Sequence, residues 1–228
     1  MKKNITISAI LIFVFALSVF YPVKTFSGDR YKEKPWIKLF EKEEKSKKSG
    51  IFNLNLDIQL GVSISKTTFN FNTTDTNHLS NTSTKVGPAA GLILSVDFLG
   101  FGFTTGLQYA SKGFKQDNGN SVNMNYFNIP LLLYFDFNIS KKVIIDGNIG
   151  PYFGLLMSSD ESTVYKIKNF DFGLTGNLQG AYMFSNHIGS LLGVKYEYGG
   201  LNNLGNNESI KSIRTSTMFI YTGVKFVL

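Results

Sequence analysis

Residues 52–64 read Phe-Asn-Leu-Asn-Leu-Asp-Ile-Gln-Leu-Gly-Val-Ser-Ile, and apolar side chains alternate with polar or small ones throughout this stretch. Successive side chains of a β-strand point to opposite faces of the sheet, so this stretch has one apolar face and one polar face. It predicts a long strand, because the alternation continues for about twice the usual strand length. The stretch matters for the whole chain because the same pattern recurs after it.

Seven further segments alternate in the same way, and the connections between them alternate in length. The predicted strands are 52–65, 87–98, 101–112, 125–138, 143–156, 170–184, 188–199 and 213–227. The connections at 66–86, 113–124, 157–169 and 200–212 are long and polar, whereas those at 99–100, 139–142 and 185–187 are tight. Long connections at one end and short turns at the other are typical of bacterial outer-membrane barrels. The sequence therefore predicts an all-β fold over residues 51–228: an eight-stranded antiparallel up-and-down transmembrane β-barrel, with both chain ends periplasmic.

The chemistry of the two faces predicts that lipid surrounds this barrel. A soluble barrel of the lipocalin kind turns its apolar face inward and carries charges outside. Here the second face holds mostly Gly, Asn, Gln, Ser and Thr, which suit the narrow interior of eight strands. Aromatic residues near the strand ends predict interfacial girdles. We expect Phe98, Phe101, Phe135, Phe137 and Phe184 at the periplasmic interface, and Tyr109, Phe127, Phe170, Phe172, Tyr196 and Tyr198 at the outer one.

Several charged residues fall in the inward phase of the predicted strands. A buried charge must be paired or hydrated, so we expect them to form an interior polar network. Lys225 lies in the last strand, which must pair with the first to close the barrel, and we expect it near Asp57. The predicted network consists of Asp57, Asp97, Asp136, Asp146, Lys195, Glu197 and Lys225, with Lys112 and Asp171 near the outer rim. Eight strands leave no open channel, which favours a structural role for these charges.

The first 50 residues differ in composition from the rest. Lys2 and Lys3, the apolar run 5–21 and small residues around Ser27 predict a secretory signal peptide over residues 1–27. A retained membrane-spanning helix is the alternative, although Pro22 follows the apolar run at once. Residues 28–50 are predicted to be a charged periplasmic segment. It is either a solvated tether or a short helix that lies on a membrane or docks on a partner.

Charge and cysteine content exclude several classes of function. The formal net charge is +7, but residues 51–228 hold twelve basic and eleven acidic residues, so the main domain is nearly neutral. The high isoelectric point therefore does not indicate nucleic-acid binding. The chain has no Cys, which excludes a disulfide framework and an acylated N-terminal Cys.

Three motifs stand out in the third, fourth and fifth predicted strands. The stretch 125–134 contains a Tyr-x-x-Ile-Pro motif formed by Tyr126, Ile129 and Pro130, and Gly150, Pro151 and Tyr152 form a Gly-Pro-Tyr segment. Together with residues 106–113 of the preceding strand, these motifs resemble those of the PorT-like outer-membrane β-barrel proteins of Bacteroidota. The resemblance implies the barrel fold and the outer membrane but no single activity, although the member that names the family is linked to type IX secretion. Proline cannot donate to the ladder, so we expect Pro130 and Pro151 either to form paired bulges or ladder defects near the outer end or to be a neutral feature of the family.

Catalytic and metal-binding patterns are weak. His78 and His187 are predicted at opposite ends of the barrel, and His78 with Ser80 and Ser83 is the one candidate for a lipid-modifying site. We therefore expect no cofactor and no enzymatic activity. The expected role is a structural, assembly or secretion-associated component of the envelope that contacts partners through residues 29–50. The alternative is a surface module whose four outer loops bind a ligand, and a small pore is a further class.

Overall fold

The structure is a computed structural model that describes residues 52–71, 82–98, 100–116, 120–160, 167–205 and 210–228. The predicted signal peptide, the charged segment 28–50 and His78 lie outside the described residues. Within the described part of the chain, no helix is long and apolar enough to cross a membrane.

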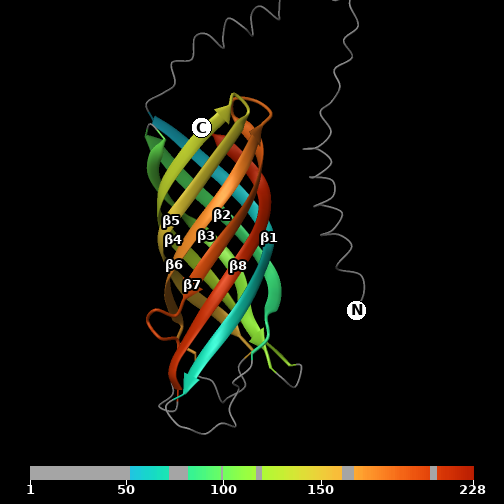
Figure 1. Ribbon diagram of the computed structural model, residues 1–228, viewed down its shortest axis with the longest axis vertical. Helices are drawn as coiled ribbons and strands as arrows, with labels where there is room; N and C mark the ends of the chain where they lie inside the picture. Colours follow the sequence, from blue (N-terminus) through green and yellow to red (C-terminus); the bar gives the residue numbers. More distant parts are fainter. Residues whose placement is uncertain (1–51, 72–81, 99, 117–119, 161–166, 206–209) are drawn as a thin grey trace, which may run out of the picture. The chain divides into compact units, whose positions relative to one another are not determined.

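Eight antiparallel strands close into a barrel in which each strand pairs with its neighbours in sequence and β8 pairs with β1 (Figure 1). The strands are β1 (Phe52–Phe71), β2 (Lys85–Phe98), β3 (Phe101–Lys115), β4 (Ser121–Ser140), β5 (Val143–Ser159), β6 (Phe170–Met183), β7 (Ile188–Gly199) and β8 (Ile210–Val227). This arrangement confirms the predicted all-β, eight-stranded antiparallel fold.

The two ends of the barrel differ in their connections. β1 begins and β8 ends at the end where short turns join the strands, which we name the turn end. The opposite end, the loop end, carries the connections 72–84, 116–120, 160–169 and 200–209. These connections are shorter than predicted, because β1, β4 and β8 in particular continue further toward the loop end. In the extended part, Lys66 to Phe71 of β1 pair with residues 210–216 of β8.

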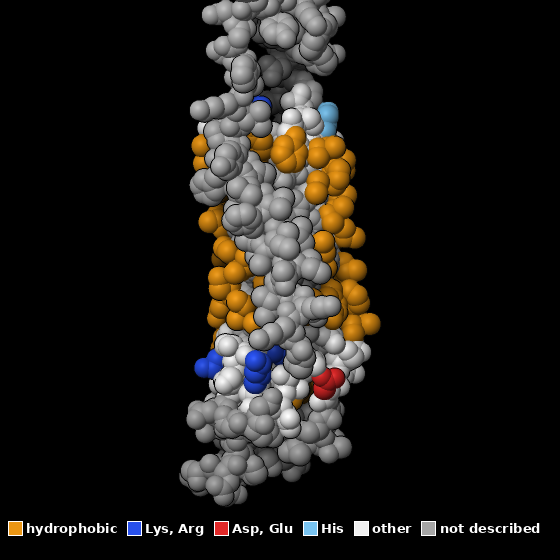
Figure 2. Space-filling view, turned by 90° about the vertical axis from the view of Figure 1, so that its right-hand side faces the viewer, with side chains coloured by type: hydrophobic (Ala, Val, Ile, Leu, Met, Phe, Trp, Pro, Cys, Tyr) orange, Lys and Arg blue, Asp and Glu red, His pale blue; other side chains and the backbone are white. Residues whose placement is uncertain are grey.

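The outer surface is apolar over the middle of the barrel, as Figure 2 shows by its wide band of hydrophobic side chains. Leu60, Phe103 and Ile149 are 63%, 70% and 60% exposed. Their neighbours along the strands are small or buried, so the predicted phase of the alternation is correct. The aromatic residues predicted for the two interfaces lie on this same face, and Phe101 is 71% exposed at the turn end. Apolar side chains therefore face outward, where a soluble barrel carries polar ones.

The alternation inverts near the loop end. In β4, Met124 and Tyr126 are fully buried inside the barrel, whereas Asn123 and Asn125, on either side of Met124, face outward. From Phe127 onward the odd-numbered apolar side chains, such as Ile129, face outward, while Leu132 and Tyr134 stay buried on the inner face. The inward apolar residues of several strands pack together and, with two loop residues, form a buried cluster that we name the apolar plug. Its members are Phe114, Val122, Met124, Tyr126, Ile167, Leu204 and Ile213. The expectation of a mostly small and polar inner face was wrong at this end.

The prolines of the family motifs lie in mid-strand, because β4 and β5 extend beyond their predicted limits. Near Pro130, the β3–β4 ladder is interrupted between the pairs Thr105↔Leu131 and Gln108↔Asn128, with no change of register. The β4–β5 ladder is likewise interrupted beside Pro151 and keeps its register there. The expected ladder defects are present, but they are not bulges and they do not lie at the outer end. The register shifts of this ladder fall at Asn125/Tyr126 and Asn138/Ser140.

Candidate functional site

Two groups of buried charges occupy the interior, and the first lies at the turn end. It consists of Asp57, Asp146 and Lys225, which we name the turn-end cluster. Asp57 and Lys225 face each other in the β1–β8 ladder, and the Lys225 Nζ lies 3.3 Å from the Asp57 Oδ1 and 3.0 Å from the Asp146 Oδ2. All three side chains are at most 3% exposed. The contact expected between Lys225 and Asp57 is thus present as an ion pair shared with a second carboxylate.

Asp97 and Asp136 lie at the same end but outside this cluster. The Asp97 side chain is buried and accepts hydrogen bonds from the Gly100 backbone N–H (2.7 Å) and from the Asn53 side-chain amide (3.1 Å). It therefore caps the β2–β3 turn. Asp136 is half-buried, and its backbone N–H donates to the Gly100 carbonyl oxygen over 3.0 Å. Neither carboxylate forms an ion pair with a described residue.

The second group lies next to the apolar plug on the side of the barrel centre, and we name it the loop-end cluster: Lys112, Asp171, Lys195 and Glu197. The Lys112 Nζ is 2.9 Å from the Glu197 Oε2 and 3.4 Å from the Asp171 Oδ2, and all three side chains are at most 1% exposed. The Lys195 Nζ lies 3.1 Å from the other Glu197 oxygen. Two ammonium groups and two carboxylates thus balance each other in a site from which water is largely excluded. Such pairing is what burial of charge requires.

Aromatic side chains surround the Lys112 ammonium. It lies 4.6 Å from the centre of the Tyr152 ring and 5.2 Å from that of Tyr126, within the range of cation–π contacts. The Tyr152 hydroxyl lies 3.2 Å from the Lys112 Nζ and donates to the Asp171 Oδ2 over 2.9 Å. Asp171 also accepts a hydrogen bond of 2.7 Å from the Gly200 backbone N–H, and this bond ties the cluster to the β7–β8 connection.

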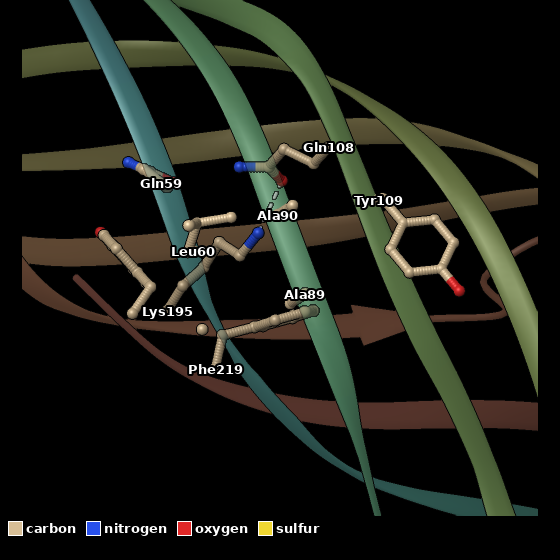
Figure 3. A pocket seen from close by; sticks show the side chains of 10 residues that line it. Gln59, Leu60, Ala89, Ala90, Gln108, Tyr109, Lys195 and Phe219 are labelled. Carbon is tan, nitrogen blue, oxygen red and sulfur yellow. Dashed lines mark hydrogen bonds between the residues drawn. The ribbon is translucent and has the colours of Figure 1, made fainter. Parts of the chain in front are cut away.

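Amides and a tyrosine extend the two clusters toward the middle of the barrel. The Gln179 side-chain amide donates to the Asp57 Oδ2 over 2.7 Å, and its oxygen accepts from the Tyr221 hydroxyl over 3.0 Å. The Lys195 Nζ donates to the Gln108 Oε1 over 2.6 Å, as Figure 3 shows. A cavity of about 20 Å³ lies between these groups and is lined by Gln59, Gln108, Lys195, Phe219 and Tyr221 among others. It has room for one water molecule and none for a larger ligand.

Strand periodicity indicates only part of this interior. The alternation of inward and outward positions along each strand places the charged residues inside, because each occupies a position on the polar face. The partners that complete the network are Gln59, Gln108, Asn128, Gln179 and Tyr221, which sequence reasoning did not single out. The signal that could have found them is the same inward phase, read for amides as well as for charges.

The motifs that carry the family resemblance meet at the loop-end cluster. Tyr126 and Tyr152 point inward onto Lys112, which belongs to the third matching stretch. Pro130 is buried and opposes Tyr152 in the β4–β5 ladder, whereas Ile129 faces outward and is 42% exposed. A Cβ on Gly150 would lie 2.4 Å from the Leu131 carbonyl oxygen, so this motif position has no space for a side chain. The three motifs, which lie on the consecutive strands β3, β4 and β5, thus meet around Lys112 in the interior, apart from the outward Ile129.

Among the described residues, the side chains considered for metal binding or catalysis are not grouped together. No group of three or more His, Cys, Asp or Glu side chains there is placed to hold a metal ion. Ser83 is exposed at the loop end, and His187 lies at the turn end, where its Nδ1 is 3.0 Å from the Val227 carbonyl oxygen. These two residues therefore cannot act together.

A family model described as the outer membrane protein beta-barrel domain matches residues 43–206. The chain belongs to this family. Its exposed apolar band is therefore the surface that contacts the lipid of a bacterial outer membrane. No curated protein matches the sequence.

Solved structures of outer-membrane barrels are similar to this family member in fold. Neisserial surface protein A is 13% identical, with a TM-score of 0.50 over 78% of this chain and 97% of its own. OprG from Pseudomonas aeruginosa is 12% identical, with a TM-score of 0.46 over 77% of this chain and 96% of its own. Ail, the attachment invasion locus protein of Yersinia pestis, was solved with the heparin analogue sucrose octasulfate. It is 14% identical, with a TM-score of 0.40 over 76% of this chain and 99% of its own. At these identities the likeness concerns the fold alone.

Proposed function

We propose that this outer-membrane barrel is a closed, non-enzymatic component of the cell envelope that acts by contact with other envelope proteins. The observation that carries the proposal is the filled interior. Two clusters of paired charges and the apolar plug occupy successive levels of the barrel, and the cavity between them holds one water molecule at most. A barrel of this kind has no path for a solute, so its surfaces outside the lipid are the parts available for function.

The PorT-like group is the subfamily that we propose for the chain. Support comes from the way in which the three motifs converge: Tyr126, Tyr152 and Lys112 pack in one buried site. The two tyrosines surround the buried lysine, and this contact is a physical reason for the three motifs to occur together in one subfamily. This support concerns the interior, and a link to type IX secretion is a further part of the proposal.

The proposed orientation places the loop end outside the cell and both chain ends in the periplasm. Bacterial outer-membrane barrels have short periplasmic turns and longer extracellular loops, and the short turns here lie at the end where β1 begins and β8 ends. Under this proposal a signal peptide over residues 1–27 exports the chain, and residues 28–50 form a charged periplasmic segment before the barrel of residues 51–228. That segment is the proposed docking site for an envelope partner.

Crosslinking and co-purification from native membranes test the proposal. The full chain is compared with a variant that keeps the signal peptide and lacks residues 29–50. We expect the full chain to recover a defined set of envelope proteins, and we expect the deletion to lose them while the barrel still inserts. A variant with a shortened loop at 72–81 is the control and should keep the same partners. Recovery of the same proteins without residues 29–50 would exclude docking through that segment.

A second candidate, a surface module that binds a ligand through the loop end, is favoured by the way two loops are held. Ile167 of the β5–β6 connection and Leu204 of the β7–β8 connection are buried in the apolar plug. Ile167 forms a bridge with Gly205, and the Lys168 N–H donates to the Leu204 carbonyl oxygen over 2.8 Å. The described ends of these two connections are thus joined to each other and to the barrel interior. If this candidate is correct, shortening the loops removes a binding or surface phenotype and the deletion of residues 29–50 does not.

A lipid-modifying activity would depend on His78, which lies outside the described residues. We expect His78→Ala to leave the mass spectrum of the outer-membrane lipid unchanged relative to the parent strain. A shift in lipid mass that is lost in His78→Ala would instead establish an enzyme.

A further inference from the structure

Basic side chains dominate the outward face just beyond the apolar band at the loop end. Among the described residues there, four exposed side chains are basic and one, Asp160, is acidic. The basic ones are Lys66, Lys115, Lys211 and Arg214. Figure 2, which faces the side of the barrel where Figure 1 labels β1 and β8, shows lysine or arginine side chains gathered directly beyond the hydrophobic band. The band and the charges therefore form one continuous outer surface.

Lys66 and Arg214 lie side by side in this surface. Lys66 of β1 opposes Ser216, and Arg214 of β8 opposes Thr68, so the two basic residues are diagonal neighbours on one face of the ladder. Diagonal neighbours in an antiparallel ladder are typically about 7–8 Å apart, which is close enough for one phosphate group to contact both side chains. We name this pair the basic strip.

Tyr198 of β7 fixes the arginine of the strip. The Arg214 Nη1 donates to the Tyr198 hydroxyl over 2.8 Å, and the guanidinium carbon lies 5.9 Å from the centre of the tyrosine ring. This contact uses one of the five guanidinium N–H groups and leaves the others for an anion. An arginine held in place loses less rotamer freedom on binding, so it is better prepared for an oxyanion than a free one.

The place of the basic strip at the edge of the apolar band indicates which anion it binds. On the same strands, two residues from Lys66 and four from Arg214, lie Ile64 and Met218 of the apolar band. A group bound by the strip therefore sits at the level where acyl chains end and headgroups begin. We infer that Lys66 and Arg214 bind the phosphate groups of lipids in the leaflet at the loop end. The inference depends on the proposed orientation only for the choice of leaflet, which would be the outer one.

Binding of a phosphorylated glycolipid to the purified full-length barrel in detergent tests this inference. The probes are lipid A with both phosphates and the same lipid with both phosphates removed. Thermophoresis measures the dissociation constant for the parent chain and for the double variant Lys66→Gln/Arg214→Gln. The matched control is Lys141→Gln/Lys142→Gln, which removes two exposed lysines at the turn end. Mobility of unheated samples on gels shows that each variant is folded.

We expect the double variant to bind bis-phosphorylated lipid A about thirty-fold more weakly, since each basic residue near an anionic surface contributes about fivefold. The control should bind as the parent does, and dephosphorylated lipid should bind all three proteins equally weakly. Higher salt should weaken binding by the parent chain more than by the double variant. Equal binding of the two lipids, or an equal loss in the control, would overturn the inference. Displacement of the lipid by the same concentration of inorganic phosphate would overturn it too, because it would indicate a site for free phosphate.

The assay is independent of the orientation in the cell. If the strip binds lipid phosphates in detergent but labelling in cells places the loop end in the periplasm, the proposed orientation fails and the binding site remains. If the loop end is outside and the two lipids bind equally, the orientation stands and the inference fails.

Discussion

Glu197 is shared by two lysines in the loop-end cluster, since each of its oxygens faces one ammonium group. The Asn128 side-chain amide also donates to it over 3.0 Å. At a site this deeply buried, removing one partner leaves the others with uncompensated charge, which costs more than the original pair contributes. A substitution that replaces the Glu197 carboxylate by an amide should therefore have a large effect on stability.

Glu197→Gln is expected to lower the free energy of unfolding by about 3–5 kcal/mol, because Lys112 and Lys195 then lack the carboxylate that they share. Urea titration of the refolded barrel in detergent, followed by far-UV circular dichroism or gel mobility, measures the change. The control Asp160→Asn removes an exposed carboxylate and should change stability by less than about 1 kcal/mol. Similar losses in the two variants would show that buried pairing is not what stabilises the interior.

Gly102 shows a second constraint at the residue scale. A Cβ at this position would lie 1.8 Å from the Val96 carbonyl oxygen, so the β2–β3 backbone would have to move. At Gly180, nothing lies within 4 Å of the same atom. We expect Gly102→Ala to destabilise the barrel by about 1–3 kcal/mol, as overpacking does, and Gly180→Ala to leave it unchanged. Refolding yield and urea titration measure the pair, and a tolerated Gly102→Ala would contradict the close approach of the strands.

At the scale of the strands, sequence reasoning succeeds in the part of each strand that crosses lipid. There, the outward side chains must be apolar and the alternation with period two identifies both the strand and its faces, as in residues 52–64 of β1. Beyond the band, both Asn125 and Asn123 face water and the apolar side chains turn inward, so the outward signal disappears although the ladder continues. The predicted strands therefore ended early at 65 and began late at 125 and 213. The hydrogen-bond partners of the interior amides could not be predicted from the alternation, because these partners lie on other strands across the barrel.

The apolar plug makes the loop end behave as a small water-soluble β-barrel core. Phe114→Ala removes a fully buried ring that packs against Phe69 with ring centres 5.0 Å apart. We expect a loss of about 3–5 kcal/mol, typical of a large cavity in a core. Phe103→Ala, which removes an outward ring of the same size that is 70% exposed, should cost less. Proteolysis of the loops should also be faster in Phe114→Ala, and an equal effect of both substitutions would argue against a packed plug.

At the scale of the whole molecule, the filled interior predicts that the barrel does not conduct ions. The full barrel reconstituted in a planar bilayer should give no unitary current steps, whereas an open porin in the same lipid gives them. The physical reason is that paired charges and apolar side chains occupy the interior from the turn end to the loop end. Regular steps above the baseline would mean that the plug opens, and they would revive a pore function.

The proposed orientation can be measured with single cysteines, because the chain has none of its own. A cysteine replacing Lys115 at the loop end should react in intact cells with a thiol reagent that cannot cross the outer membrane. A cysteine replacing Lys141 in the β4–β5 turn should react only after the outer membrane is permeabilised. The reverse pattern would place the chain ends outside the cell.

The inversion of the alternation in β4 also sets how deeply the protein is immersed. Asn125 faces outward on the loop side of Phe127, and Ile129 faces outward on its turn side. A vertical displacement by two residues, about 7 Å of strand, would submerge the amide in hydrocarbon or lift the isoleucine into water. The outward side chains therefore fix the depth at which the barrel sits in the membrane. A bilayer of different thickness must adjust around the protein, because a shift of the barrel would expose one of these side chains to the wrong environment.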